Sequence, residues 1–356
     1  MYDVIVVGAG PAGSVAAKKC IENGLKTLLV DKRTLPRDKL CSGMLMGRMA
    51  NELVQQEFGT IPENVLTTPK YLRGIMVHAL GGDPVVVEQR MPFAWRRDLD
   101  FWMVQKAKQA GVELRDQARV LSVEQDGELC RVKLENEILE ARFVVGADGS
   151  KSTVRKSTFP GIPVVARLVY RWVYPGRLSL DREYFHWIFP LPRPRPRFDV
   201  NHKGDCFIIE GGLRELKKNI TQYLTPYGFS EEHKPMWKDG CISSSRLVEG
   251  FLSRPSPLAR GNVLIAGDAA MLQYPVSGEG IAMALKSGLI AARSIKESVS
   301  SRGNVAEIYS RQMEPALDIL RGLLAHEKKL EEAGKYGPWA VAKAFADGLR
   351  ATFVIA

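Results

Sequence analysis

The chain has 356 residues, 45% hydrophobic and 25% charged, which is the composition of a folded protein with one large core or two domains sharing one. The formal net charge of +10 fits either a lysine-rich cytosolic surface or attraction to anionic partners such as phosphorylated substrates or acidic lipid heads. No helix-turn-helix, zinc-finger or aromatic RNA-binding pattern accompanies the charge, so we expect no nucleic-acid partner.

Cysteine usage and the N-terminus place the chain in a compartment. The five cysteines are scattered and form neither a CxxC pair nor a metal-ligand spacing, which favours a reducing compartment over a disulfide framework and predicts no metal site. The sequence opens directly on a strand pattern without the features of a signal peptide. No apolar run reaches the roughly 18 residues of a membrane-spanning helix. We expect a cytoplasmic protein, with peripheral contact at the inner membrane face as a further hypothesis.

The pattern of apolar residues predicts strands and helices in alternation, followed by a β-rich middle and a helical end. In chain order we expect a strand at 3–8, a helix at 12–23, a strand at 26–31, a loop at 32–47, a helix at 99–110, β-structure at 118–147, an antiparallel sheet within 160–250 with a short helix near 214–224, a strand at 262–266, a helix at about 279–297 and helices through 304–350.

A glycine-rich turn follows the first strand. Gly8, Gly10 and Gly13 have the GxGxxG spacing, in which the first glycine permits a tight turn, the second lets the backbone approach a pyrophosphate, and the third permits close packing of helix on strand. The helix that begins here offers unpaired N–H groups to phosphates. Asp31, at the end of the second strand, is placed to accept hydrogen bonds from ribose hydroxyls. This unit alone fits NAD or FAD.

Two further segments favour FAD. In each, a strand ends in glycine and aspartate: Val145–Ser150 with Asp148, and Gly261–Ala270 with Asp268. Each carboxylate is placed near a sugar-like polyol. The turn Gly278–Gly280 then begins a helix whose positive end we expect to face the electron-rich pyrimidine edge of a reduced flavin. A plain dehydrogenase has no reason to repeat this arrangement.

These three motifs, in this order, resemble those of the flavoprotein superfamily of aromatic hydroxylases, flavin halogenases and geranylgeranyl reductases. The resemblance spans roughly residues 1–300 and implies FAD. It implies that Asp31 holds the adenosine ribose and Asp268 the ribityl chain. It places Arg96 at the flavin-side phosphate or ribityl region and the Val120 backbone at the adenine. The other implied cofactor residues are Gly8, Gly10, Ala12, Gly13, Lys32, Cys41, Ser42, Asp148, Gly267, Gly278, Gly280 and Ile281.

Two segments resemble the geranylgeranyl reductase branch in particular. Residues 36–45, PRDKLCSGML, are similar to its PRxKxCxGxL segment, in which the cysteine lies beside the isoalloxazine ring; this implies a catalytic role for Cys41 in tuning the flavin or delivering a proton. Residues 185–190, FHWIFP, are similar to its YxWxFP motif, which lines the substrate cavity. Phe185 here replaces the tyrosine, and Tyr184 is one position out of place. The implied substrate residues are Phe185, Trp187, Phe189 and Pro190.

The resemblance implies an α/β fold: a Rossmann-like FAD-binding domain, a mixed or antiparallel-sheet substrate domain and C-terminal helices. We assign 1–70, 96–155 and 255–300 to the FAD-binding domain, 71–95 and 156–254 to the substrate domain, and 301–356 to the C-terminal helical segment.

The expected activity is reduction of carbon–carbon double bonds in an isoprenoid-like or other apolar substrate. A hydroxylating monooxygenase and a non-catalytic flavin, lipid-binding or electron-transfer protein remain alternatives. No second dinucleotide fingerprint is visible, so the reductant is either NAD(P)H that binds transiently or a protein electron donor.

Two basic segments suggest contact with anionic groups. Arg193, Arg195 and Arg197 are spaced by prolines directly after the aromatic segment, where they are placed to meet a phosphate head while the aromatic residues hold an apolar tail. The segment 339–353 combines Lys343 and Arg350 with apolar residues, a pattern that fits a helix resting on an acidic membrane surface; the apolar residues are Trp339, Val341, Phe345, Leu349 and Phe353. The alternative is that the arginines only keep their loop soluble and that the terminal helix packs on the core.

Overall fold

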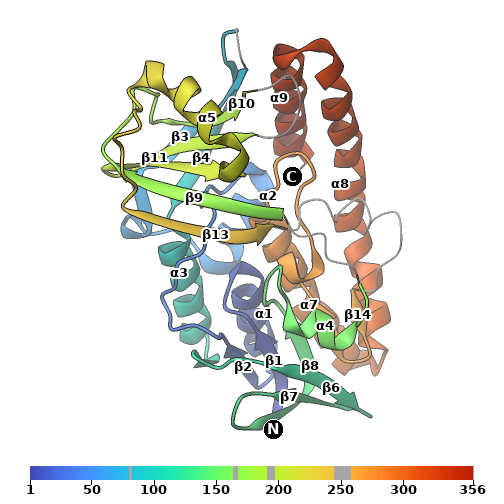
Figure 1. Cartoon of the computed structure of the whole chain (residues 1–356). Coiled ribbons are helices and arrows are strands. Elements are labelled where there is room, and N and C mark those ends of the chain that lie inside the picture. The colour runs from blue at the N-terminus through green and yellow to red at the C-terminus, as the bar shows by residue number, and fades with distance from the viewer. Residues whose placement is uncertain (80–81, 163–166, 191–196, 244–257, 356) are drawn as a thin grey trace.

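The computed structural model describes residues 1–79, 82–162, 167–190, 197–243 and 258–355, whose strands form two sheets (Figure 1). The first sheet has the strand order β14 (Ala259–Arg260), β15 (Val263–Ile265), β8 (Ile138–Gly146), β1 (Tyr2–Val7), β2 (Thr27–Val30) and β5 (Glu113–Arg115). The antiparallel pair β6 (Ser122–Asp126) and β7 (Leu129–Lys133) joins it through β8.

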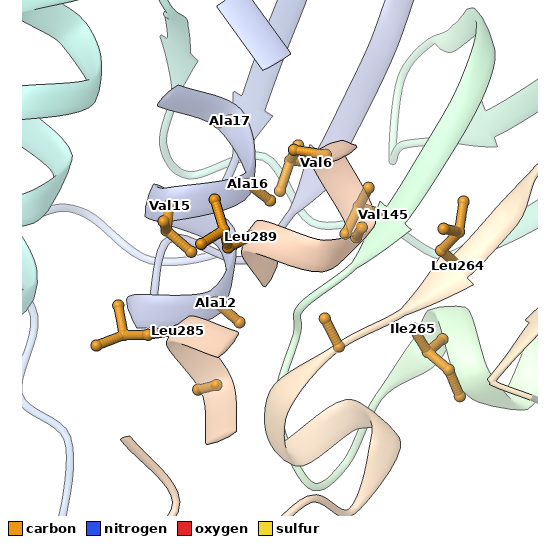
Figure 2. Packing of buried hydrophobic residues seen from close by; sticks show 14 of the residues in the cluster. Val6, Ala12, Val15, Ala16, Ala17, Val145, Leu264, Ile265, Leu285 and Leu289 are labelled. Carbon is orange, nitrogen blue, oxygen red and sulfur yellow. The ribbon is translucent and has the colours of Figure 1, made fainter. Parts of the chain in front are cut away.

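The central strands of the first sheet are parallel and apolar on both faces. Val4 to Val7 of β1 and all of β2 are buried, as expected for parallel strands that are covered on both sides. The associated helices are α1 (Pro11–Glu22), α3 (Arg96–Gln109) and α7 (Ile281–Ser301). Figure 2 shows Val15 of α1 beside Leu289 of α7. A Cβ at Gly288 would lie 2.2 Å from the Ala12 carbonyl oxygen, so this crossing requires a glycine.

The second sheet lies across the top of the first in Figure 1. Its strand order is β13 (Trp237–Ser243), β9 (Arg167–Pro175), β12 (Cys206–Gly211), β11 (Phe198–Lys203), β10 (Tyr184–Phe189), β3 (Leu66–Ala79) and β4 (Val85–Ala94). Every neighbouring pair is antiparallel except β10 and β3, which are parallel, so the sheet is mixed.

The two faces of the second sheet have different surroundings. Because side chains alternate along a strand, Phe198, Val200 and Phe207 point to one face, where they form a core with Ile220 and Leu224 of α5 (Leu213–Leu224). The opposite face is apolar at β3, β4 and β10, where it meets the C-terminal helix, and is charged at β11, β12 and β9. This second face looks toward the first sheet.

Two long helices end the chain and run side by side in Figure 1: α8 (Val305–Ala333) and α9 (Pro338–Ile355). Val341, Phe345 and Leu349 of α9 are fully buried against the second sheet. For these three residues the alternative of a helix packed on the core is confirmed and the membrane surface is wrong; Trp339 keeps 53% of its surface exposed. No helix among the described residues is long and apolar enough to cross a membrane.

The α/β fold class with C-terminal helices is confirmed, and the predicted strands and helices correspond to observed ones. The sequence analysis did not predict α2 (Gly47–Phe58) or the hairpin of β3 and β4. The remaining short elements are α4 (Thr153–Thr158), η1 (Glu63–Val65), η2 (Thr225–Tyr227), η3 (Gly267–Ala270) and η4 (Gly334–Tyr336). The division into domains stays a prediction.

Candidate cofactor and substrate site

A cavity of about 1610 Å³ has walls from both sheets. Segments that follow β1, β2, β8 and β15 line one side, at the carboxyl ends of the parallel strands, which is where open α/β sheets bind their ligands. Residues of β9, β10, β11, β12 and β13 line the other side. The predicted site residues that line the cavity are Gly8, Ala12, Asp31, Lys32, Cys41, Ser42, Arg96, Val120, Asp148, Phe185, Trp187, Asp268, Gly278, Gly280 and Ile281.

The glycine loop between β1 and α1 is built for close approach. Gly8 has φ of +104°, and a Cβ there would lie 2.4 Å from the Ala147 carbonyl oxygen. A Cβ at Gly13 would lie 1.8 Å from the Gly8 carbonyl oxygen, so Gly13 serves packing and lies behind the cavity wall. At Gly10 a Cβ would meet only the Arg37 guanidinium, at 3.7 Å. Within the described residues, no side chain caps the start of α1, which leaves its N–H groups for a pyrophosphate.

Asp31 is held in place by three donors. One carboxylate oxygen, Oδ2, accepts hydrogen bonds from the Ala9 backbone N–H at 2.9 Å and from Arg37 Nε at 3.2 Å, and Oδ1 accepts one from the Arg33 N–H at 3.0 Å. Arg37 also reaches Asp100 at 3.3 Å. Arg37 therefore lies over the glycine loop beside Asp31, where it fits the charge of a pyrophosphate. The sequence analysis quoted Arg37 within a motif but gave it no role.

Arg96 is buried at the start of α3 and forms a two-point ion pair with Asp100 on the next turn, at 2.7 and 2.9 Å. Burial opposes its charge, but Asp100 and Cys41 outweigh that effect and raise the pKa of Arg96. Arg96 thus presents a permanent positive charge to the cavity next to Cys41.

Backbone contacts fix the segment that carries Cys41. Gly43 has φ of +71°, and a Cβ there would lie 1.9 Å from the Ala94 carbonyl oxygen. Lys203 of β11 donates to the carbonyl oxygens of Ser42 at 2.5 Å and Ala94 at 2.8 Å. Cys41 therefore lies at a defined position between the two sheets.

The Asp148 carboxylate forms hydrogen bonds within the protein, at the start of α4. Its carboxylate accepts hydrogen bonds from the Ser152 hydroxyl at 2.5 Å and from the backbone N–H groups of Thr153 and Val154 at 2.6 and 3.2 Å. Burial raises the pKa of Asp148 although these donors oppose the shift. The carboxylate thus holds the first turn of α4, and its contact with a cofactor stays a prediction.

Arg155 joins two of the segments that favour FAD. It is almost fully buried and donates to the carbonyl oxygen of Ser150 at 2.6 Å and to that of Ala269 at 2.5 Å. The loop after β8 and the turn after β15 are therefore held together from behind the cavity.

Asp268 follows β15 and keeps part of its carboxylate available. Its Oδ1 accepts a hydrogen bond from Gln273 Nε2 at 3.0 Å, and within the described residues its Oδ2 accepts none. Gly267 lies behind it, where a Cβ would be 3.1 Å from the Ala12 side chain, and does not line the cavity. The arrangement fits an acceptor for a polyol chain.

The Glu279 side chain forms hydrogen bonds with the first turn of α7, which was not predicted from the sequence. Glu279 Oε1 accepts hydrogen bonds from the backbone N–H groups of Ile281, at 2.5 Å, and Ala282, at 3.2 Å. Burial raises the pKa of Glu279 to about 8, against the effect of these two donors. Glu279 thus caps two N–H groups at the helix start, a role that was not predicted, and the contact of this helix end with the flavin stays a prediction. The signal was a glutamate between the two glycines of the turn.

The aromatic segment of β10 is divided between wall and core. Phe185 and Trp187 line the cavity, whereas Phe189 packs behind it on Phe345 of α9, with ring centroids 5.1 Å apart, and Pro190 does not line it. Tyr184 points to the other face and donates to Glu88 at 2.6 Å, so its hydroxyl does not replace the one that Phe185 lacks.

Arg197 lines the cavity, with its guanidinium 4.7 Å from the Trp187 ring centroid and a hydrogen bond to the Val276 carbonyl oxygen at 3.0 Å. The predicted positions of Arg193 and Arg195 lie outside the described residues.

Proteins similar in sequence or structure to this chain include FAD-binding proteins and reductases. A family model described as an FAD binding domain matches residues 1–167. Digeranylgeranylglycerophospholipid reductase of Methanocaldococcus jannaschii is 25% identical over 98% of this chain and 92% of its own length. Menaquinone reductase of Mycobacterium tuberculosis is 27% identical over 82% of this chain and 75% of its own. A solved geranylgeranyl bacteriochlorophyll reductase-like protein of Thermoplasma acidophilum shares the fold, with a TM-score of 0.79, 19% identity, and coverage of 99% of this chain and 96% of that one.

The chain is therefore an FAD-dependent oxidoreductase. Its sequence is similar to digeranylgeranylglycerophospholipid reductases over most of its length, and the motifs around Cys41 and Trp187 resemble those of the geranylgeranyl reductase branch.

Proposed function

We propose that this chain reduces carbon–carbon double bonds in the prenyl chains of a lipid, with FAD as the redox cofactor. The observation that carries the proposal is that the FAD-type segments, Cys41 and the aromatic wall of β10 meet in one cavity. The two curated relatives named above are reductases, and the name of one of them specifies a prenylated glycerophospholipid.

The chemistry of the wall fits an apolar chain beside a flavin. Phe185, Trp187, Met44 and Met46 line the cavity, and flexible thioethers and aromatic rings accommodate an irregular hydrocarbon. When bound and reduced by two electrons, FAD would supply the hydride to one carbon of the double bond. The protein orients the chain against the rings of β10 and limits the access of water to the reacting carbons.

Arg197 is the described residue that we expect a charged lipid head group to contact. Arg197 places a positive charge at the cavity beside Trp187, which supports a phosphate or another anionic group at the head of the substrate. Contact with an acidic membrane surface remains part of this proposal, with Trp339 as the exposed aromatic residue of α9 that it would use.

The test is an anaerobic reoxidation experiment. The FAD-loaded protein is reduced with dithionite and mixed with a geranylgeranyl glycerophospholipid, with its fully saturated analogue, or with oxygen, and the flavin spectrum is followed. We expect the unsaturated lipid to reoxidise the flavin and the saturated analogue to leave it reduced. A hydroperoxide-like spectrum with oxygen and no response to lipid would instead indicate a monooxygenase. No productive response to either would indicate an electron-transfer or binding protein.

A further inference from the structure

A row of ionisable side chains crosses the cavity-facing side of the second sheet. The strand registers pair Asp199 of β11 with Glu210 of β12, Glu210 with Arg171 of β9, and Arg171 with Asp239 of β13. Residues paired in this way project to the same face with their Cβ atoms about 5 Å apart. Asp199, Glu210 and Asp239 all line the cavity.

Arg171, the arginine among these four residues, forms its ion pair mainly with Asp239. Arg171 donates to Asp239 from Nε at 2.9 Å and from Nη2 at 2.6 Å, which is the two-point geometry of a strong ion pair. Its Nε lies 4.0 Å from Glu210 Oε1, beyond hydrogen-bond distance. Asp199 and Glu210 therefore lie side by side, and Arg171 is hydrogen-bonded to neither of them.

Both carboxyl groups are buried and incompletely satisfied. Asp199 is 6% exposed and Glu210 is 5% exposed. Within the described residues, Asp199 Oδ1 and Glu210 Oε1 have no hydrogen-bond partner. A buried polar atom without a partner is costly, so an oxygen of this kind on a cavity wall indicates a group that meets a ligand or shares a proton.

The surroundings of the pair favour its protonated form. Burial raises the pKa of Asp199 well above its usual value, and Glu210 adds to the rise while Arg197 opposes it. Burial also raises the pKa of Glu210, against the attraction of Arg171 and Lys203. The other charged or titratable groups that face the pair are Asp239 from β13 and Lys39 and Cys41 from the loop after β2. Two adjacent buried carboxyl groups cannot both ionise readily, so burial and their proximity together favour a form in which one proton is shared.

The pair also lies next to the aromatic wall. The register of β10 and β11 places Trp187 opposite Asp199, and both side chains line the cavity. A prenyl chain held against Trp187 would therefore have this carboxyl pair at its flank.

We propose that Asp199 and Glu210 share a proton and act together as the general acid that protonates the double bond. The inference rests on the proposed reductase function and names the catalytic group which that function requires besides the cofactor. Its competitor for this role is Cys41, which the motif alone suggested.

The step balances as a net addition of one hydride and one proton. The hydride, with its electron pair, comes from the reduced flavin and forms a C–H bond at one carbon. The π electrons form the second C–H bond with the acid proton while the carboxyl O–H bond breaks. The pair is left with one additional negative charge and regains its proton from water. The flavin is reduced again by a two-electron donor, either a reduced nicotinamide or a redox protein.

The test uses Asp199→Asn, Glu210→Gln and the double variant, with Asp205→Asn as the matched control. Asp205 lies in the same β-hairpin with its side chain 93% exposed, so its replacement removes a carboxylate without touching the cavity. Unfolding temperature and FAD content identify any variant that misfolds. Two readouts are then compared in the correctly folded proteins.

The first readout is the infrared carbonyl band of protonated carboxyl groups, recorded across pH on protein with and without FAD. We expect a band at neutral pH in the wild type and in Asp205→Asn that is weaker in the double variant, because the pKa of Glu279 is raised to about 8 and this group contributes to the band in all three proteins. Equal bands in the wild type and the double variant, or no band in the wild type, would overturn the shared proton.

The second readout is the rate at which the geranylgeranyl glycerophospholipid reoxidises the dithionite-reduced flavin, as a function of pH. The wild-type rate should fall as pH rises and the pair loses its proton. The double variant should be slower by about 10²- to 10⁴-fold and lack this pH dependence. A wild type that the lipid does not reoxidise refutes the reductase function itself. A wild type that responds, together with a double variant of equal rate and pH profile, refutes only the carboxyl pair.

Discussion

Replacement of Asp268 by alanine tests how the chain holds FAD. The carboxylate follows β15, lines the cavity, and has one described hydrogen-bond partner, Gln273 at 3.0 Å. Its removal therefore disturbs the protein itself little, because one amide loses one acceptor. The predicted ribityl contact, in contrast, is lost entirely.

The expected size of the effect follows from the strength of a charge-assisted hydrogen bond. Such a bond contributes about 1.5 to 3 kcal/mol. At 1.4 kcal/mol for each factor of ten, Asp268→Ala should weaken FAD binding about 10- to 150-fold. Titration of the apoprotein with FAD, followed by flavin fluorescence or calorimetry, measures this directly.

Asp38→Ala is the matched control, because Asp38 also lines the cavity but is exposed and lies in the loop after β2. It removes the same charge, so any general electrostatic effect on the anionic cofactor appears in both variants. Equal FAD affinity in Asp268→Ala and wild type, or equal changes in the two variants, would show that Asp268 makes no specific contact.

Three further predictions concern packing, redox chemistry and pH. Gly13→Ala should destabilise the fold by about 3 kcal/mol, because its Cβ would lie 1.8 Å from the Gly8 carbonyl oxygen. Gly322→Ala is the control, because the space around Gly322 is open and no destabilisation is expected. Thermal unfolding compares the two variants, and equal melting temperatures would contradict the close packing at Gly13. Cys41→Ser should keep its FAD content but change the rate of electron transfer to the lipid, and unchanged stopped-flow kinetics would return Cys41 to a structural role. Because the pKa of Asp199 is raised on folding, its contribution to the stability of the wild type should decrease as pH rises above about 4. The stability of Asp199→Asn should therefore decrease less than that of the wild type over the same pH range. Melting curves recorded across pH test this, and parallel curves for the two proteins would refute it.

Local patterns predicted the cofactor side of the site. The glycine loop, Asp31 and Asp268 each follow a strand that can be read from a short apolar run, and parallel strands bring their carboxyl ends to one edge. The helix-capping role of Asp148 was also within reach, since Ser152 follows it at a typical N-cap position.

The β3–β4 hairpin was missed because its burial depends on a distant part of the chain. β3 and β4 contain prolines and charges that argue against strands, and their apolar residues are buried by α9 from the far end of the chain. Helix α2 did carry a local signal, with Ala50, Leu53, Val54 and Phe58 buried along one face.

The carboxyl pair was missed for a related reason. An aspartate and a glutamate in two separate strands become neighbours only through the register of β11 on β12. The position of Asp199 between the apolar residues Phe198 and Val200 was the available signal, since a buried acid requires an explanation. Tertiary packing against the first sheet then decides that this face borders a cavity and not solvent.

The most direct test of the central claim is the mass of the lipid after a single turnover. The FAD-loaded protein is reduced with dithionite in D₂O without oxygen, mixed with less than one equivalent of a geranylgeranyl glycerophospholipid, and the extracted lipid is analysed by mass spectrometry. Reduction of a double bond predicts the incorporation of two deuterium atoms into the prenyl chain for each flavin reoxidised. A lipid of unchanged mass beside a flavin that stays reduced would contradict the assignment of this chain as a prenyl-lipid reductase.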